Sequence, residues 1–356
     1  MSKQLRILFS GGGTMGSVSP LLAVYQELKK KNLDSQFLFL GTKNGPEQKI
    51  VESYQIPFKA IESGKFRRYW SWQNLIDPLK IILGFFQALK LVYDFKPQAV
   101  MVAGAFVGVP VAWASWLLRI PVLVHQQDIE KGLANKLMSP IAKKITVSFD
   151  VSLKDFPAKK TILTGNPIKS EFYNCQRESA LEFFDLNSDL PVILITGGGT
   201  GSQNINNLVK DSLPKITKFA QVIHTTGKGK SFNFDSENYH QYEFLSHEMP
   251  EALCVADLVV SRAGLSTLTE LSVSSKPVVL IPLYGTHQEL NASYYQKNNS
   301  AVVVSEKGLS AQTLSDLLRD LLSRKDKLES LSANISKIMP RDGALKIAGL
   351  LIDLIS

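Results

Sequence analysis

Two segments, one in each half of the chain, join a short apolar run to a glycine cluster that contains a threonine. Residues 6–10 lead into GGGTMG at 11–16, and residues 191–196 lead into GGGTG at 197–201. Glycine allows sharp turns and close approach to a ligand, and a helix that follows offers free N–H groups to an anion. We therefore expect two similar α/β halves that face a phosphate-bearing ligand across a cleft, as in a two-domain nucleotide-sugar enzyme.

Neither cluster is a strict G-x-G-x-x-G fingerprint, and no acidic residue is clearly placed about twenty residues later to hold a ribose. Two tight β-to-α turns without a ligand are the alternative. The chain has no G-x-x-x-x-G-K-[ST] motif, which disfavours a P-loop ATPase.

Composition indicates a soluble globular protein with two domains, since 356 residues with 44% hydrophobic and 20% charged content can form two cores. Cys175 and Cys254 are the only cysteines, so we expect neither a disulfide framework nor a thiolate metal site. The N-terminus does not resemble a signal peptide, and the default expectation is a cytoplasmic protein.

The charge is concentrated in one half. Residues 1–165 hold 22 Lys and Arg against 11 Asp and Glu, whereas the remainder holds 18 against 21. A basic half predicts a surface that meets an anionic partner, either nucleic acid or anionic lipid, although a solvated basic face is also compatible.

Short apolar runs alternate with helical stretches, which predicts parallel sheets covered by helices on both faces. Residues 99–118 are uncharged and long enough to span a membrane, but glycines and Pro110 divide them, so we predict a strand, a turn and a helix instead. The domain boundary is placed at 165/166, and a last helix at 343–356 is expected to pack back on the first half. The predicted strands are residues 5–9, 35–40, 99–103, 122–125, 144–147, 192–196, 221–224, 258–261 and 277–281.

Further motifs follow the predicted strands in an order that resembles one family. They are a basic aromatic loop at 63–69, HQQD at 125–128, GNPIK at 165–169, HTTGKG at 224–229, and SRAGLSTLTE at 261–270 followed by HQELN at 287–291. Together they resemble the bacterial peptidoglycan glycosyltransferases of family 28, the MurG family, over essentially the whole chain. The resemblance implies a GT-B fold, with two Rossmann-like doubly wound parallel-sheet domains that face a central cleft.

The resemblance also implies substrates and site residues. A family member transfers N-acetylglucosamine from UDP-N-acetylglucosamine to lipid I with inversion, which gives lipid II. Helix dipoles would then stabilise the diphosphate, so no metal site and no obligatory cofactor is expected. Glu270 matches the carboxylate that binds the ribose, and Gln288 and Asn291 match residues that bind the sugar. The other residues expected at the donor site are Thr14, Met15, Gly16, Asp128, Lys169, Gly199, Thr200, Leu245, Ser246, Leu265, Ser266 and Thr267, with Gly199 standing where the family usually has a serine.

The first glycine loop departs from the family pattern at Ser17, where the family usually has a histidine that is a candidate general base. A serine hydroxyl holds its proton too tightly for this work near neutral pH. We therefore predict His125 or Asp128 as catalytic residues, although a lone histidine such as His125 is often structural. Lys169 and Phe106 replace a usual arginine and tyrosine.

Residues 72–89 place tryptophan, leucine, isoleucine and phenylalanine at helical spacing, with lysines interspersed, and two further tryptophans follow at 113 and 116. A core-facing stripe explains such spacing, but the breadth of the stripe and the charge suit an anionic inner leaflet. Nucleic acid is not expected. The acceptor and membrane side is assigned to Lys65, Arg67, Arg68, Phe106 and Asn135.

The sequence thus predicts a peripheral glycosyltransferase on the cytoplasmic face of the cell membrane, with cell-wall synthesis and division proteins as partners. Two alternatives stay open: a GT-B relative that glycosylates another lipid acceptor, and a catalytically silent protein that binds UDP-sugar. A nicotinamide dehydrogenase is a more distant alternative.

Overall fold

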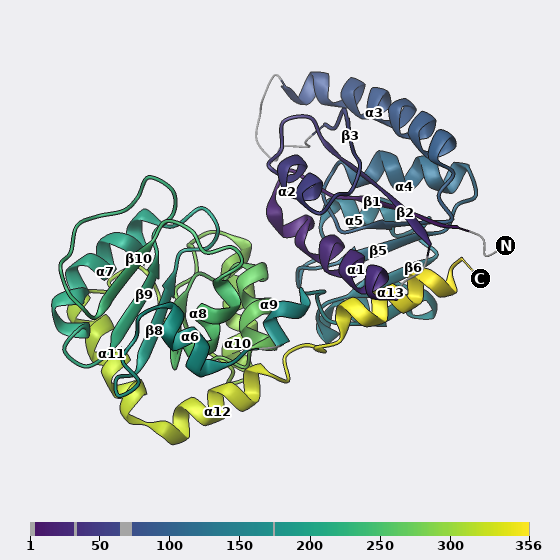
Figure 1. The fold of residues 1–356 in the computed structure, drawn as a ribbon. Coiled ribbons are helices and arrows are strands. Elements are labelled where there is room, and N and C mark those ends of the chain that lie inside the picture. The colour runs from purple at the N-terminus through teal and green to yellow at the C-terminus, as the bar shows by residue number, and fades with distance from the viewer. Residues whose placement is uncertain (1–3, 32–33, 65–72, 174, 356) are drawn as a thin grey trace. The chain divides into compact units, whose positions relative to one another are not determined.

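The computed structural model describes residues 4–31, 34–64, 73–173 and 175–355 (Figure 1). They form two compact units, one of residues 1–170 with 339–356 and one of residues 171–338. The observed boundary thus lies five residues beyond the predicted one at 165/166, and the last helix, α13 (Gly343–Asp353), belongs to unit 1.

Unit 1 is built on a seven-stranded sheet in the order β3-β2-β1-β4-β5-β6-β7, with every pair of neighbours parallel. Parallel strands need crossover connections, and helices supply most of them. The strands are β1 (Leu5–Ser10), β2 (Ser35–Thr42), β3 (Phe58–Ile61), β4 (Ala99–Val102), β5 (Val122–Gln126), β6 (Lys144–Val147) and β7 (Thr161–Leu163). The helices before the unit boundary are η1 (Met15–Ser17), α1 (Ser19–Lys30), α2 (Glu47–Ser53), α3 (Gln73–Phe95), α4 (Gly108–Leu117), α5 (Leu133–Met138), η2 (Asp150–Asp155) and η3 (Ala158–Lys160), and η4 (Ser170–Tyr173) lies at the boundary.

Alternate residues of each strand point to opposite faces of this sheet and enter separate cores. In β1, Leu8 packs in the core that includes α3 and α4, whereas Ile7 and Phe9 pack in the core that includes α1 and α13. Figure 1 shows α1 and α13 side by side, where Ile347 of α13 is fully buried. The C-terminal helix therefore completes the hydrophobic core of unit 1.

Unit 2 is a six-stranded parallel sheet in the order β10-β9-β8-β11-β12-β13. One core lies between this sheet and helices α7 and α11, with Ile195 of the sheet and Val209 of α7 fully buried in it. The strands are β8 (Val192–Thr196), β9 (Gln221–Thr225), β10 (Tyr239–Tyr242), β11 (Leu258–Ser261), β12 (Val278–Leu280) and β13 (Val302–Val303). The helices are α6 (Arg177–Phe183), α7 (Gln203–Ile216), α8 (Met249–Val255), α9 (Leu265–Val273), α10 (His287–Lys297), α11 (Ala311–Ser323) and α12 (Lys325–Ile335).

All nine strands predicted from the sequence are present, and four more are found. The additional strands, β3, β7, β10 and β13, are the edge strands of the two sheets. The uncharged segment 99–118 forms β4, a turn and α4, as expected, although α4 begins two residues before Pro110. Among the residues that the structure describes, no helix combines the length and the apolar character needed to cross a bilayer.

The expectation about the cysteines requires correction. Cys175, just before α6, and Cys254, in α8, form a disulfide in unit 2. The bond closes a loop with a sequence separation of 79 residues. Cysteine spacing did not indicate this pair because α6 and α8 are brought together only by the folded unit.

Candidate active site

The first glycine loop follows β1 and is held by side chains within unit 1. The Ser17 hydroxyl accepts a hydrogen bond from Gly12 N (3.0 Å) and lies within donating distance of the carbonyl oxygens of Gly12 (3.1 Å) and Thr14 (3.2 Å). Gly13 has φ of +78°, a conformation that glycine adopts readily, and Thr14 is exposed. Ser17, only 7% exposed, therefore shapes the loop, a role that sequence comparison did not suggest.

The N–H groups of Gly12 and Gly13 both point to protein acceptors, the Ser17 hydroxyl and the Glu47 carboxylate. These two N–H groups are therefore engaged within the protein, whereas the N–H groups expected to face an anion are those of the helix that follows the cluster. Glu47 escaped notice in the sequence because it lies 34 residues from Gly13 and belongs to no recognised motif.

At the end of β5, His125 is fully buried. Its Nδ1 lies 2.9 Å from the Thr146 hydroxyl, and its Nε2 lies 2.9 Å from the Asn166 side-chain oxygen. Burial lowers the pKa of His125 from 6.5 to about 4, although the hydrogen bonds with Asn166 and Thr146 favour the charged form. Through these two contacts the buried, neutral imidazole links β5 to β6 and to the segment at 165–169.

The turn after β5 holds the other predicted residues of this region. Asp128 is exposed, and Asn135, 5% exposed, donates to the Gln126 side-chain oxygen (2.6 Å). Gln126 in turn donates to the carbonyl oxygens of Asp128 (2.7 Å) and Glu130 (2.9 Å). Asn135 therefore acts on the Asp128 turn through Gln126.

The remaining predicted residues of unit 1 are less tightly linked to these two loops. Phe106 is half-buried in the turn after β4, and the Lys169 ammonium lies 5.2 Å from the centre of the Tyr54 ring. Lys65, Arg67 and Arg68 lie outside the described residues, as does the side chain of Met15.

In unit 2, the second glycine cluster follows β8 and leads into α7, with Ser202 as the N-cap residue. Gly199 and Thr200 are exposed. The Phe244 ring is 60% exposed and lies next to Gly199. A Cβ placed on Gly199 would be 4.0 Å from the ring. Sequence reasoning named Leu245 and Ser246 but missed Phe244, although an exposed aromatic ring is a surface on which a base can stack.

Leu245 and Ser246 differ in their surroundings. Leu245 is buried at 4% exposure, whereas Ser246 is exposed and donates its N–H to the Glu248 carboxylate (3.0 Å). The hydrogen bond from its own backbone N–H, followed by the one from Ser246, lowers the pKa of the Glu248 carboxylate.

The segment after β11 carries the predicted donor loop. Gly264 is the extended N-cap of α9, so the first turn of that helix begins at Leu265 and includes Ser266 and Thr267. Glu270 is half-buried and lies one turn after Thr267.

Helix α10 supports this loop. Asn291, 2% exposed, donates to the Ala263 carbonyl oxygen (3.1 Å), directly before Gly264. The Gln288 side-chain oxygen accepts from Leu283 N (3.1 Å). This hydrogen bond links Asn291 to the predicted donor loop and holds the residue that precedes Gly264 in place.

A partly buried ion pair joins segments at the same edge of the sheet. Arg262, 5% exposed, donates to both Glu306 carboxylate oxygens (3.2 and 2.7 Å), to the Ile281 carbonyl (2.9 Å) and to the Ser202 hydroxyl (2.9 Å). The side-chain hydrogen bond from Arg262 holds the pKa of Glu306 below its usual value. Arg262 therefore ties the segments after β11, β12 and β13 to the start of α7.

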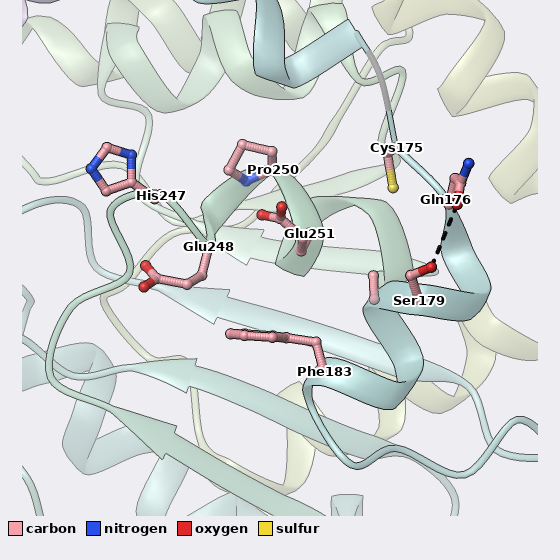
Figure 2. A pocket seen from close by; sticks show the side chains of 9 residues that line it. Cys175, Gln176, Ser179, Phe183, His247, Glu248, Pro250 and Glu251 are labelled. Carbon is pink, nitrogen blue, oxygen red and sulfur yellow. Dashed lines mark hydrogen bonds between the residues drawn. The ribbon is translucent and has the colours of Figure 1, made fainter.

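A cavity of about 380 Å³ in unit 2 is separate from these predicted residues. Figure 2 shows Phe183 of α6 on one side of it and His247, Glu248 and Glu251 on the other. None of the residues predicted to bind substrate lines this cavity. Among the described residues, His, Cys, Asp and Glu form no group of three that could hold a metal ion.

The two parallel-sheet α/β units, with glycine loops at the carboxyl ends of β1 and β8, form a GT-B fold. Residues 7–147 match the glycosyltransferase family 28 N-terminal domain, and residues 192–344 match the family's C-terminal domain. The chain belongs to glycosyltransferase family 28.

Two relatives carry the same descriptive name, UDP-N-acetylglucosamine--N-acetylmuramyl-(pentapeptide) pyrophosphoryl-undecaprenol N-acetylglucosamine transferase. The one from Legionella pneumophila strain Lens is 38% identical over 331 residues, which is 91% of each chain. The one from Clostridium kluyveri is 38% identical over 336 residues, which cover 92% of this chain and 95% of the relative.

Solved structures share the fold. The crystal structure of MurG from Acinetobacter baumannii gives a TM-score of 0.77 at 24% identity and covers 98% of this chain and 99% of its own. The UDP-GlcNAc 2-epimerase from Neisseria meningitidis, bound to UDP-GlcNAc, gives 0.67 at 14% identity, with 99% of this chain and all of the other covered.

Proposed function

We infer that this glycosyltransferase moves N-acetylglucosamine from UDP-N-acetylglucosamine to the C4 hydroxyl of the N-acetylmuramyl group of lipid I, with inversion. The observation that carries the inference is the Gly264–α9 segment with Asn291 bonded to it, in a chain 38% identical to transferases named for this reaction.

The donor binds unit 2 in this proposal. The free N–H groups in the first turn of α9 face the diphosphate, where the helix dipole favours negative charge. Glu270 accepts hydrogen bonds from the ribose hydroxyls, and Gln288 contacts the sugar. The exposed Phe244 ring supports stacking of the uracil.

The reaction is a single displacement at the anomeric carbon. The acceptor oxygen forms the new bond to that carbon, the bond to the UDP oxygen breaks, and the electron pair leaves with UDP. The acceptor proton passes to a base. Asp128 is the better candidate for this base because it is exposed, whereas His125 is buried and both of its ring nitrogens are hydrogen-bonded within the protein.

No divalent ion is required in this proposal, since the α9 N-terminus supplies the positive potential at the leaving group. Transfer that is unchanged after treatment with EDTA would support this part, and restoration by added Mg²⁺ would contradict it.

Unit 1 takes the lipid acceptor and rests on the cytoplasmic face of the membrane. Its charge excess accompanies an apolar surface of α3 and α4, on which Ile82 and Phe86 are 55% and 60% exposed. Such a surface flanked by basic residues favours an anionic leaflet. A shallow cavity of about 480 Å³ on this surface is lined by Ile81, Ile82, Phe85, Phe86, Val109, Pro110 and Trp113. The cell-wall and division proteins named above as partners stay predictions.

The test is an assay of the full chain with UDP-N-acetylglucosamine and a short-chain lipid I analogue, read by mass spectrometry of the product. The expected result is a mass gain of one N-acetylhexosamine. Transfer only to a different polyprenyl-linked sugar would establish the alternative acceptor. Donor binding without transfer to any acceptor would establish the silent homologue, which the Ser17 departure and the buried His125 favour.

A donor-site variant tests the assignment of Glu270. Glu270→Ala should weaken UDP-N-acetylglucosamine binding by about 1.5–3 kcal/mol, measured by calorimetry, because hydrogen bonds to a carboxylate are lost. Glu329→Ala, an exposed position on α12, is the matched control. Equal affinities of the two variants would remove Glu270 from the donor site.

A further inference from the structure

The first glycine loop contacts a buried carboxylate that no motif or family match assigns. Glu47, the first residue of α2, is fully buried. One of its oxygens accepts from Thr42 N (2.7 Å) and from the Thr42 hydroxyl (2.5 Å), and the other accepts from Gly13 N (3.2 Å). The carboxylate thus joins the end of β2 to the glycine loop after β1.

Two glycines leave the space that the Glu47 carboxylate occupies. A Cβ added to Gly12 or to Gly45 would collide with a Glu47 carboxylate oxygen. A buried charge is costly unless several donors satisfy it. Two backbone N–H groups, a hydroxyl and two close glycines therefore make a fitted site for the Glu47 side chain.

Ser17 holds the same loop from another side. Its hydroxyl engages Gly12 N and the Gly12 and Thr14 carbonyls, while Glu47 engages Gly13 N. Consecutive peptide groups of the loop are thus fixed by two buried side chains, and Thr14 is exposed. The Gly12–Gly13 peptide, one residue before Thr14, is held at both ends, since its N–H donates to Glu47 and its carbonyl oxygen accepts from Ser17.

We propose that Glu47 is a positioning residue for the transfer reaction, which fixes the first glycine loop and thereby aims Thr14 at the reacting substrates. The proposal rests on the proposed function and on the assignment of Thr14 to the substrate site, which the resemblance to the family implies. Glu47 itself contacts no substrate. A loop displaced by about 1 Å can lower turnover by 10²-fold, so one lost bond at Gly13 has a measurable effect.

The test is Glu47→Gln in the full-length protein. The amide oxygen of glutamine keeps the Thr42 contacts, but its NH₂ group faces Gly13 N–H, so the Gly13 bond alone is lost. We expect kcat with the lipid I analogue to fall at least tenfold, while KM for UDP-N-acetylglucosamine stays within twofold. Hydrogen exchange of the peptide that covers residues 11–17 should quicken at least tenfold, with the 197–201 loop unchanged.

Two variants separate positioning from general destabilisation. Thr42→Val removes a hydroxyl bond to the carboxylate but keeps the Gly13 bond, so kcat should stay within threefold of wild type. Glu52→Gln, at an exposed position on α2, should match wild type in all measurements. If Glu47→Gln proves too unstable to assay, the Thr42→Val variant still decides, because a tenfold loss of kcat in that variant, which keeps the Gly13 bond, would refute positioning through Gly13.

The outcomes distinguish this inference from the proposed function. Wild-type protein that fails to transfer N-acetylglucosamine refutes the proposed function, and the hydrogen-exchange arm still tests the contact. Active wild type with an equally active Glu47→Gln variant refutes the inference alone. In a Thr14→Ala background, Glu47→Gln should lower kcat by less than threefold, because the two residues act through one loop.

Discussion

Replacing His125 by a residue without an imidazole should reduce the loss in the free energy of unfolding of unit 1 when the pH is lowered from 7 to 4. The folded protein holds the pKa of His125 at about 4, against 6.5 in a solvated chain, because the ring is fully buried. The unfolded chain therefore binds a proton below pH 6.5 that the folded unit does not. Stability is fully present above pH 6.5 and declines as the pH falls towards 4.

The magnitude follows from the size of the shift. A lowering from 6.5 to about 4 corresponds to about 3 kcal/mol of stability at neutral pH. His125→Gln also loses the imidazole contacts with Thr146 and Asn166, so it should be less stable at pH 7. Its loss of stability between pH 7 and pH 4 should be about 3 kcal/mol smaller than that of wild type.

Urea unfolding followed by tryptophan fluorescence is the suitable assay, because Trp113 and Trp116 lie in α4 of unit 1 and the sequence of residues 171–338 contains no tryptophan. His224 supplies the matched control, since it is buried in unit 2 and burial also lowers its pKa to about 4. His224→Gln should leave the fluorescence profile unchanged. Parallel pH profiles for wild type and His125→Gln would refute the reasoning, as would titration of His125 near pH 6.5 by NMR.

Three further predictions concern the ion pair, the disulfide and the apolar surface. Arg262→Met leaves Glu306 without its buried partner and should lower the free energy of unfolding of unit 2 by about 3 kcal/mol. The change should be seen by circular dichroism but not by tryptophan fluorescence, and an unchanged unfolding midpoint would contradict this prediction. Cys254→Ser opens the loop across 79 residues and should cost about 2–4 kcal/mol, and dithiothreitol should lower wild type to the same level without affecting the variant. Phe86→Ser should weaken co-sedimentation with anionic vesicles about tenfold or more, as burial of a phenylalanine is worth about 1.5–3 kcal/mol. Phe183→Ser, also 60% exposed but in unit 2, should bind as wild type does; equal losses in both would exclude a specific role for α3.

The sequence by itself determined the class of fold and the central strands. Runs such as residues 192–195 are apolar throughout because both faces of a central parallel strand are buried, so they are evident from the sequence alone. The four strands that were not predicted, β3, β7, β10 and β13, are all edge strands with partly exposed residues. Their pairing with one neighbour and their mixed polarity leave little local signal.

The glycine clusters and the donor segment were also visible in the sequence, because a turn that needs glycine or a helix N-terminus is encoded over a few adjacent residues. The tertiary structure alone decided how these loops are held. The Gly13–Glu47, Arg262–Glu306 and Cys175–Cys254 contacts join residues 34, 44 and 79 positions apart. Local patterns do not encode such contacts, since they arise only when parallel strands bring their carboxyl ends to one edge and helices pack together.

Tertiary structure also decided the state of the histidine that the sequence offered as a base. An imidazole has a pKa of about 6.5 in water, and the HQQD motif gave no indication that folding would enclose it. Packing of β5 against β6 and against the 165–169 segment buries His125 completely, and the loss of hydration makes its charged form costly. The chemical type of a residue is written in the sequence, but its proton affinity and its accessibility are properties of the packed site.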